Sequence, residues 1–369
     1  MGTTGINHQE FVVSTFTPGP LLTAARSFPS VLWNDSSDLD ELRQSISFGG
    51  VGATCNPVIA LTTISAHLDI WAPRIQAIAD AHPTWSESEI GWQAVKDMSV
   101  EAAALLEPAF EEHKGRNGRL SVQTDPRYFR NAEKLADQAE EFHHMAKNII
   151  VKIPATEIGL KAIEEATYRG VSINVTVSFT LAQAVASAEA IERGLKRREA
   201  EGLPIDGQTA VVTLMVGRLD DWVKEAVARK GIFIDASALE WAGVATFKKA
   251  YQIFQERGYR SRVLAAAFRN VLHWTELQGG DVVVSPPFKW QAIINASDYE
   301  PTARIDVPVD EHYLKELSRV PEFLEAYEED GLAVEDFQNY GLTRKTLRQF
   351  LQADADLDTL VRNIILPAP

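Results

Sequence analysis

The stretch NIIVKIPAT, residues 148–156, combines the pattern of a buried strand with a charged residue. Four apolar β-branched residues surround Lys152, and Pro154 ends the run. Short apolar runs of this kind predict a strand that is buried on both faces. The rest of the chain must therefore explain why a lysine occupies the interior of such a strand.

Two interpretations of Lys152 are open at this point. A lysine on an edge strand can extend its aliphatic stem over apolar neighbours and keep its ammonium group in water. A fully buried lysine is rare, because removing an ammonium group from water costs several kcal/mol. Burial lowers the pKa of an amine, and a neutral amine can attack a carbonyl carbon.

The composition is typical of a folded enzyme. The 369 residues can form one barrel-sized domain with extensions or two ordinary domains, and charged and hydrophobic residues make up 24% and 45%. The net charge of −15 argues against nucleic acid and an anionic membrane as partners, although local arginines can still bind an anionic substrate. Cys55 alone cannot form a disulfide framework, and no signal sequence or membrane span is visible, so a cytoplasmic location is expected.

Strand-like and helix-like segments alternate along the chain, which predicts a parallel sheet. Helices are expected within residues 131–148 and 180–202. Eight strands are the number that closes a (β/α)₈ barrel, although an open doubly wound sheet fits the same pattern and residues 231–236 could form a ninth strand. The eight predicted strands cover residues 31–35, 49–54, 119–125, 148–153, 171–179, 209–216, 262–268 and 281–286.

The remaining segments define the expected domain organisation. Residues 1–30 are predicted to be irregular, and residues 31–299 to form the barrel. Residues 300–369 contain helical patterns without strands, and they are expected to pack on the outside of the barrel or across one mouth.

Polar residues recur near the ends of seven predicted strands. Where one predicted strand carries two or three of them, these residues lie on the same face. Residues two apart in a strand point to the same side, and the active sites of (β/α)₈ barrels lie at the carboxyl ends of the strands. Singly, each residue is better explained as a turn former or a helix cap. In chain order, the strand-end residues are Asp35, Thr54 and Asn56, Ser121 and Gln123 and Asp125, Lys152, Asn174 and Thr176 and Ser178, Thr213 and the following Arg218, and Arg269.

Five motifs, in this order and spacing, resemble the transaldolase family of Schiff-base-forming (β/α)₈ barrels. The resemblance covers residues 31–295, and the helical C-terminal extension is similar to that of a longer subgroup of the family. The motifs are GATCNP (52–57), IIVKIPAT (149–156), INVTVSFTLAQA (173–184), VGRLDDW (216–222) and AAAFRN (265–270).

The resemblance implies a role for each catalytic position. Lys152 would attack the ketone of a ketose phosphate and form an imine. Asp35 would take the proton from the C4 hydroxyl as the C3–C4 bond breaks. Thr176 would hold the water that transfers protons during imine formation, and Gln123 would help to position it. No metal or organic cofactor is expected, because the imine itself accepts the electrons.

The resemblance also implies which residues bind the substrate. Asn56 and Asn174 would hold the three-carbon dihydroxyacetone unit until an aldose phosphate arrives. Arg218 and Arg269 would bind the terminal phosphate with charge-assisted hydrogen bonds. The two remaining substrate-binding positions implied by the motifs are Thr54 and Thr213.

The chain departs from the usual family pattern at three positions. Gln123 replaces the usual glutamate, and a glutamine cannot accept a proton from the water. This residue is typical of the fructose 6-phosphate aldolase branch, yet that branch has a tyrosine where this chain has Met215. Ala267 replaces a phosphate-binding serine, which removes one hydrogen bond to the anion and is compatible with another anionic group such as a sulfonate.

The predicted function is the transfer of a dihydroxyacetone unit between sugar phosphates, as in the pentose phosphate pathway. One alternative is an aldolase that releases dihydroxyacetone, and another is a transaldolase for a sulfo-sugar such as sulfofructose. A binding protein without catalytic activity is the third, although such a protein would gain nothing from a buried lysine. A homodimer remains an option for the assembly.

Overall fold

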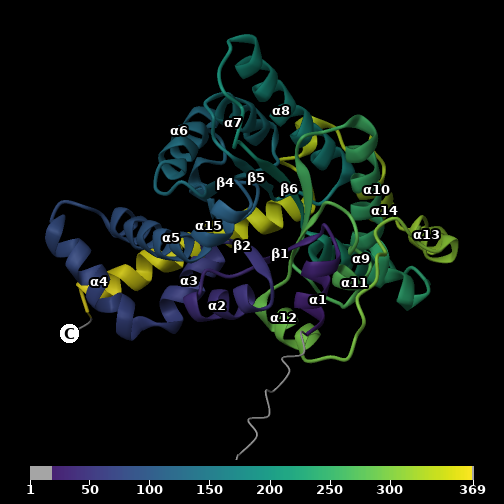
Figure 1. Cartoon of the computed structure of the whole chain (residues 1–369), viewed down its shortest axis with the longest axis horizontal. Coiled ribbons are helices and arrows are strands. Elements are labelled where there is room, and N and C mark those ends of the chain that lie inside the picture. Colours follow the sequence, from purple (N-terminus) through teal and green to yellow (C-terminus); the bar gives the residue numbers. More distant parts are fainter. Residues whose placement is uncertain (1–18, 368–369) are drawn as a thin grey trace, which may run out of the picture.

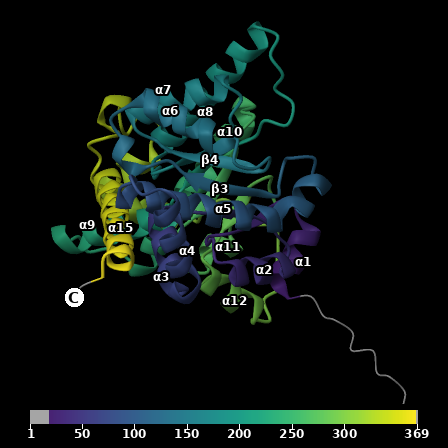
Figure 2. The ribbon, with the colours of Figure 1, turned by 90° about the vertical axis from the view of Figure 1, so that its left-hand side faces the viewer.

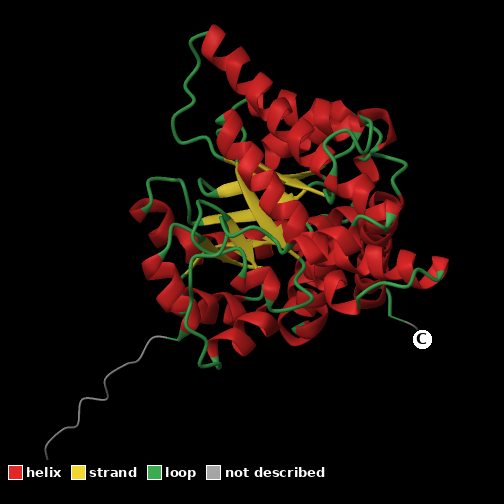
Figure 3. Cartoon of the chain, turned by 90° about the vertical axis from the view of Figure 1, so that its right-hand side faces the viewer, coloured by secondary structure: helices red, strands yellow, loops and turns green. Residues whose placement is uncertain are grey.

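The computed structural model of the chain describes residues 19–367, and in this part eight parallel strands close into a barrel (Figures 1 and 3). The strands pair in the order of the chain, and β1 pairs with β8 to complete the ring. They are β1 (Val31–Asn34), β2 (Gly50–Thr54), β3 (Arg119–Gln123), β4 (Ile149–Pro154), β5 (Ile173–Thr176), β6 (Ala210–Leu214), β7 (Arg262–Ala266) and β8 (Val283–Ser285).

The closed ring confirms the predicted (β/α)₈ barrel and rules out the open sheet. Each observed strand lies within the predicted segment or extends one residue beyond it. The ninth strand considered at residues 231–236 is not formed. Gly231 ends a helix there in the left-handed conformation, at φ 64°, and the following residues lead into a 3₁₀-helix.

Helices surround the barrel and cover the outer face of the strands (Figure 3). Among the described residues they are α1 (Pro20–Ser27), α2 (Leu39–Ser47), α3 (Pro57–Ala66), α4 (Leu68–Ala81), α5 (Glu87–Glu112), α6 (Ala132–His143), α7 (Glu157–Tyr168), α8 (Leu181–Ala200), α9 (Val216–Lys230), α10 (Ala242–Arg257), α11 (Leu272–Thr275), α12 (Phe288–Asn295), α13 (Glu311–Leu317), α14 (Pro321–Tyr327) and α15 (Gly341–Ile365), with the 3₁₀-helices η1 (Pro126–Tyr128), η2 (Ala236–Trp241) and η3 (Val334–Asp336).

The strands alternate between two apolar environments. Trp33, Ile150, Val211 and Leu264 form a cluster inside the barrel. Their neighbours along the strands, such as Val151, pack outward against the helices. Both faces of each strand are therefore buried, as the apolar runs in the sequence predict. This alternation directs Lys152, two residues after Ile150, into the barrel.

The N-terminal prediction requires a correction. Residues 1–30 were expected to be irregular, but Pro20–Ser27 form α1. A proline at the first helical position has the right φ angle and needs no hydrogen-bond acceptor for its nitrogen, which favours a helix start. Most of the rest of this segment, residues 1–18, lies outside the described residues.

The C-terminal helices occupy two different places. The short helices α13 and α14 pack outside the barrel, against η2, α9 and α10. The long helix α15 crosses the mouth at the carboxyl ends of the strands and continues along α3, α4 and α5 (Figures 1 and 2). Within residues 19–367, none of the helices combines the length and apolarity that crossing a bilayer requires.

The amphipathic pattern of α15 explains its position. Leu347 and Phe350 pack against Val177 and Met215 at the ends of β5 and β6. Farther along the helix, Leu357 packs against the cluster formed by α3, α4 and α5. One apolar stripe of a single helix therefore covers part of the mouth and a neighbouring helical layer.

Candidate active site

Lys152 lies near the carboxyl end of β4, where the active sites of such barrels are found. In the sheet it pairs with Gln123 of β3 and with Asn174 of β5. The lysine is 4% exposed, and none of the carboxylates in the described residues lies within 4.0 Å of its amine. Burial lowers the pKa of Lys152 from its ordinary value, and the Asp35 carboxylate only partly opposes this effect. This environment favours a neutral, nucleophilic amine.

Asp35 follows β1 and lies close enough to Lys152 for its charge to act on the amine. Thr54, at the end of β2, donates a hydrogen bond of 2.6 Å to one oxygen of the Asp35 carboxylate. This bond orients the carboxylate and leaves its second oxygen available. Burial raises the pKa of the adjacent Cys55 thiol to about 11, which keeps the thiol protonated and unreactive.

A chain of hydrogen bonds crosses three strands beside the lysine. Thr213 of β6 donates to the amide oxygen of Asn174 at 2.7 Å, and the amide nitrogen of Asn174 donates to Ser121 of β3 at 2.9 Å. These bonds define the orientation of the Asn174 amide, which keeps one N–H available for a ligand. Thr213 and Asn174 were predicted as separate binding residues, and the structure joins them.

Three buried oxygen atoms of the inner strand faces have no protein partner among the described residues. They belong to Gln123 of β3, Thr176 of β5 and Ser285 of β8. Buried polar atoms without a partner are rare in native proteins and often mark a place where a ligand or water binds. Ser285 was not predicted, although it is in phase with the inward-facing Val283.

Asn56 has the structural task that was considered for each strand-end residue singly, because it caps a helix. Its side-chain oxygen accepts hydrogen bonds from the backbone N–H groups of Val58 and Ile59, and it thereby caps the amino end of α3. The oxygen is occupied, so only the amide nitrogen of Asn56 can take part in substrate binding.

The two predicted phosphate-binding arginines meet at one edge of the mouth. Arg218 lies in the first turn of α9, and Arg269 follows β7. A Cβ atom on Gly217 would lie 2.0 Å from the carbonyl oxygen of Ala267, so a glycine is required for this close approach. Burial, assisted by the nearby Arg269 charge, lowers the pKa of Arg218 from its ordinary value. The amino end of α9 adds to the attraction for an anion.

A buried acid–histidine pair links the segments that carry these arginines. Arg269 donates its backbone N–H to Nδ1 of His273 at 3.0 Å, so Nε2 of His273 carries the proton and donates to Asp220 at 2.8 Å. Asp220 also accepts a hydrogen bond from the backbone of Gly243 at 2.8 Å. The pair thus connects the amino-terminal parts of α9 and α10 with the loop after β7. Neither residue was predicted, because they lie 53 positions apart.

Two strand ends at the mouth have strained backbones. Val177, after β5, has φ 51°, and Ala267, after β7, has φ 62°. A β-branched residue is especially unfavourable in this left-handed region, and such strain costs on the order of 1–3 kcal/mol per residue. Strained positions of this kind cluster at ligand sites, where the surrounding structure holds them.

Helix α15 supplies two threonines to the covered part of the mouth. Arg218 donates to the hydroxyl oxygen of Thr346 at 3.3 Å, and Gln183 of α8 donates to Thr343 at 3.4 Å. Both threonines are fully buried. Asp35, Asn56 and Arg218 remain partly exposed, so the mouth stays accessible beside the helix.

A buried carboxylate fastens the middle of α15 to the barrel. Asp354 accepts a hydrogen bond of 3.1 Å from the indole of Trp92 in α5 and lies 3.1 Å from the guanidinium of Arg127. Burial and then the negative charge of Asp125 raise the pKa of Asp354 to about 6. The positive charge of Arg127 lowers the pKa of Asp354, and the negative charge of Asp358 raises it.

We expect this carboxylate to make the stability depend on pH. In the unfolded chain Asp354 loses its proton near pH 4, whereas in the folded chain it keeps the proton to about pH 6. As the pH rises through this interval the unfolded state ionises first, so the wild type becomes easier to unfold. Relative to Asp354→Asn, the wild type should lose on the order of 3 kcal/mol in the free energy of unfolding.

Urea unfolding of both proteins from pH 4 to pH 7 measures this difference. Asp356→Asn, on the exposed side of the same helix, is the control and should show no such trend. A stability difference between wild type and Asp354→Asn that stays constant across the range contradicts the expectation.

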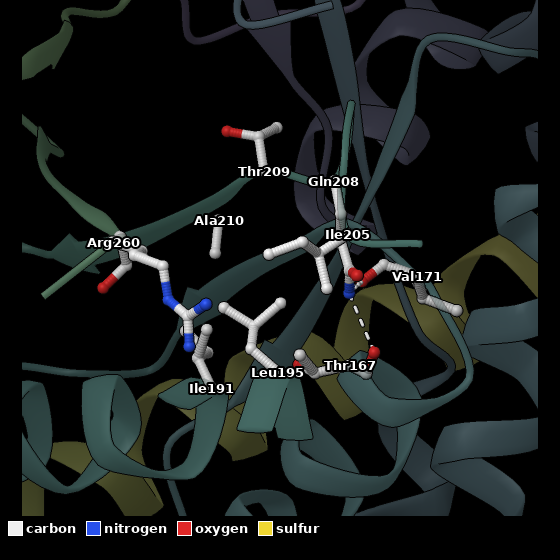
Figure 4. A pocket seen from close by; sticks show the side chains of 10 residues that line it. Thr167, Val171, Ile191, Leu195, Ile205, Gln208, Thr209, Ala210 and Arg260 are labelled. Carbon is white, nitrogen blue, oxygen red and sulfur yellow. Dashed lines mark hydrogen bonds between the residues drawn. The ribbon is translucent and has the colours of Figure 1, made fainter. Parts of the chain in front are cut away.

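A separate cavity of about 60 Å³ opens at the opposite end of the barrel (Figure 4). It lies beside Ala210, where β6 begins, and aliphatic side chains such as Ile191 and Leu195 form much of its wall. At one side of the cavity, the amide nitrogen of Gln208 donates a hydrogen bond of 2.8 Å to the carbonyl oxygen of Thr167. Because this end of the barrel carries the amino ends of the strands, we assign the cavity to packing.

The fold and the residues at the strand ends agree with the sequence comparison. The chain belongs to the family described as "Transaldolase/Fructose-6-phosphate aldolase", whose model matches residues 32–359. The expected resemblance is thereby confirmed over most of the chain.

Two relatives illustrate the degree of similarity. The chain is 32% identical over 222 residues to "Transaldolase 1" of Streptomyces avermitilis, a match that covers 59% of this chain and 58% of that protein. It is 34% identical over 248 residues to "Transaldolase" of Thiobacillus denitrificans, with 64% and 67% covered. The chain thus spans between somewhat over half and two thirds of the length of these relatives.

Proposed function

We propose that this protein transfers a dihydroxyacetone unit from a ketose phosphate to an aldose phosphate through a Schiff base on Lys152. The observation that carries the proposal is the buried amine of Lys152 at the carboxyl end of β4, next to the Asp35 carboxylate. Membership of the family and the names of the similar proteins support the transaldolase type of reaction.

The first half of the reaction uses the groups around the lysine. The neutral amine of Lys152 attacks the ketone carbon, and loss of water gives an imine. Gln123 and Thr176 would hold that water, and the lack of protein partners for their buried oxygens in the described structure supports this role. Asp35, oriented by Thr54, takes the proton from the C4 hydroxyl while the C3–C4 bond breaks and its electrons pass to the imine.

The second half requires that the three-carbon enamine stays in place. The fixed amide of Asn174 offers one N–H to its hydroxyl groups, and the amide nitrogen of Asn56 offers further donors. The enamine then attacks the aldehyde of the acceptor, Asp35 returns its proton, and hydrolysis of the new imine frees Lys152. Arg218 and Arg269 bind the terminal anion of donor and acceptor in turn.

The same proposal divides the chain by function. Residues 31–299 would be the catalytic barrel and residues 300–369 the C-terminal extension, whose helix α15 covers part of the mouth. The substrates are sugar phosphates or, given Ala267, sugars with another terminal oxyanion.

Borohydride trapping tests the Schiff base. Incubation with fructose 6-phosphate followed by borohydride should leave a stable adduct on Lys152, and peptide mapping by mass spectrometry should locate it. A second ketose, such as a sulfo-sugar, is tested in parallel. If none of the ketoses leaves an adduct on Lys152, the proposed mechanism is wrong.

A second candidate function rests on Gln123. A glutamine at this position cannot accept a proton from water, and it is compatible with aldol cleavage that releases dihydroxyacetone. Dependence on the acceptor separates the two reactions. A transferase forms product only when an aldose phosphate is present, whereas the aldolase reaction proceeds without one.

A further inference from the structure

Thr346 of α15 holds its hydroxyl group directly beside the guanidinium of Arg218. The residue is fully buried, and Arg218 donates to its oxygen at 3.3 Å. A guanidinium can only donate hydrogen bonds, so the hydroxyl oxygen is the acceptor here. The proton of the Thr346 hydroxyl must therefore find another partner.

Other hydroxyl groups in the helices of this protein use that proton within their own helix. Ser99, Ser187, Thr246 and Thr359 each donate to the carbonyl oxygen four residues earlier, at 2.7–3.0 Å. In the described residues Thr346 makes no such bond. Its proton is thus left for a group outside the helix.

Arg218 shows the same deficit. Its Nε atom is buried and has no acceptor in residues 19–367. Two donors, the Thr346 hydroxyl and the Nε–H of the arginine that contacts it, therefore lack an acceptor within the described residues. Burying such donors costs on the order of 1–3 kcal/mol each unless an acceptor arrives. A tetrahedral oxyanion has enough oxygen atoms to accept from both.

The neighbouring strand end explains why a helix would provide this hydroxyl. Ala267, at the end of β7, has no side-chain donor, and it packs in the same cluster as Leu347 and Phe350 of α15. The helix therefore lies against the place where the barrel itself offers no hydroxyl.

We infer that Thr346 completes the oxyanion site of Arg218, and that α15 thereby forms part of the substrate-binding site. The ligand is the terminal phosphate or sulfonate of the sugar, so the inference rests on the proposed function. The hydroxyl donates to one oxygen of the anion while Arg218 binds the others.

The test compares two threonine-to-valine variants of one helix. Thr346→Val keeps the shape and removes the donor, so it should weaken the binding of inorganic phosphate to the resting protein about three- to tenfold in calorimetry. Thr343→Val, one turn earlier and equally buried, loses only its bond to Gln183 and should bind phosphate like the wild type. Thr346→Ser should restore most of the affinity.

Steady-state kinetics provide the second readout. Thr346→Val should raise KM for fructose 6-phosphate by the same factor and leave kcat within about twofold, since Thr346 contacts the anion rather than the reacting carbons. If Thr346 had only a structural role, Thr346→Val would lower the thermal midpoint of unfolding without raising KM selectively over kcat.

The outcomes separate this inference from the proposed function. Equal phosphate affinity in Thr346→Val and Thr343→Val overturns the inference, whether or not the enzyme turns over. A missing borohydride adduct on the wild type overturns the proposed function instead. Parallel titration with methanesulfonate identifies the anion, because the cognate group should bind more tightly and should lose more affinity in Thr346→Val.

Discussion

Lys152→Met abolishes turnover, with a decrease in kcat of at least about 10³-fold, because no other amine can form the imine. Within the described residues, the only other buried lysine, Lys248, is 4% exposed but bonded to Glu276 at 2.8 Å on the outside of the barrel. Methionine has a similar length and no charge, so the interior packing is retained. The measurement is the rate of transfer from fructose 6-phosphate, together with circular dichroism to verify the fold.

The same variant should be more stable than the wild type near neutral pH. Burial lowers the pKa of Lys152, so the folded state gives up the proton at a lower pH than the unfolded state does. Between the lowered pKa of the folded state and the ordinary lysine pKa, the stability of the wild type therefore rises with pH. The stability of the methionine variant lacks this contribution. The advantage of the variant, on the order of 1–3 kcal/mol, should shrink as the pH approaches the ordinary lysine pKa.

Two results would contradict this account of Lys152. Substantial activity in Lys152→Met would mean that the reaction does not pass through an imine on this residue. A variant that is less stable than the wild type at neutral pH would mean that the ammonium group is favourably solvated in the interior.

Arg218→Ala increases KM for a phosphorylated ketose roughly 10- to 150-fold, with a much smaller change in kcat. Arg218 is the more buried of the two arginines at the mouth, and one charge-assisted hydrogen bond contributes about 1.5–3 kcal/mol to binding. Arg269→Ala should have a smaller effect, because Arg269 already donates to the Asp221 carboxylate at 2.8 Å. Steady-state kinetics with fructose 6-phosphate measure both changes.

Arg260→Ala is the matched control for the loss of a positive charge. Arg260 lines the cavity at the opposite end of the barrel, where it pairs with Glu192 at 2.8 Å and Glu199 at 2.6 Å. Its removal should leave KM unchanged. An equal increase of KM in the Arg218 and Arg260 variants would assign the effect to net charge rather than to a site.

The barrel could be predicted from the sequence because its strands are buried on both faces. Segments such as residues 148–153 and 209–216 are apolar runs of strand length, and helical periodicity separates them. The segment 231–236 is also a short apolar run, but it does not form a strand. Gly231 ends α9 in the left-handed conformation, and Phe233 is 91% exposed. Local composition cannot distinguish a buried strand from an exposed loop of apolar residues.

The candidate site could be predicted from two kinds of local pattern. Lys152 stands out as the charged residue in an apolar run, and alternation puts Asn174 and Thr176 on one face of their strand. The motifs of the family resemblance supply Thr213, Arg218 and Arg269. Partnerships across the fold leave no local pattern. Thr346 lies 128 positions from Arg218, and a helical period shows that its face is buried without showing against what.

The connectivity of α15 has a consequence for how the protein is made. All eight strands precede the helix in the chain, with residues 286–340 between β8 and α15. A ribosome therefore releases a complete set of strands before it releases the segment that carries Thr346. The barrel can form first with its mouth open, and the nascent protein acquires its full anion affinity only when the later segment docks.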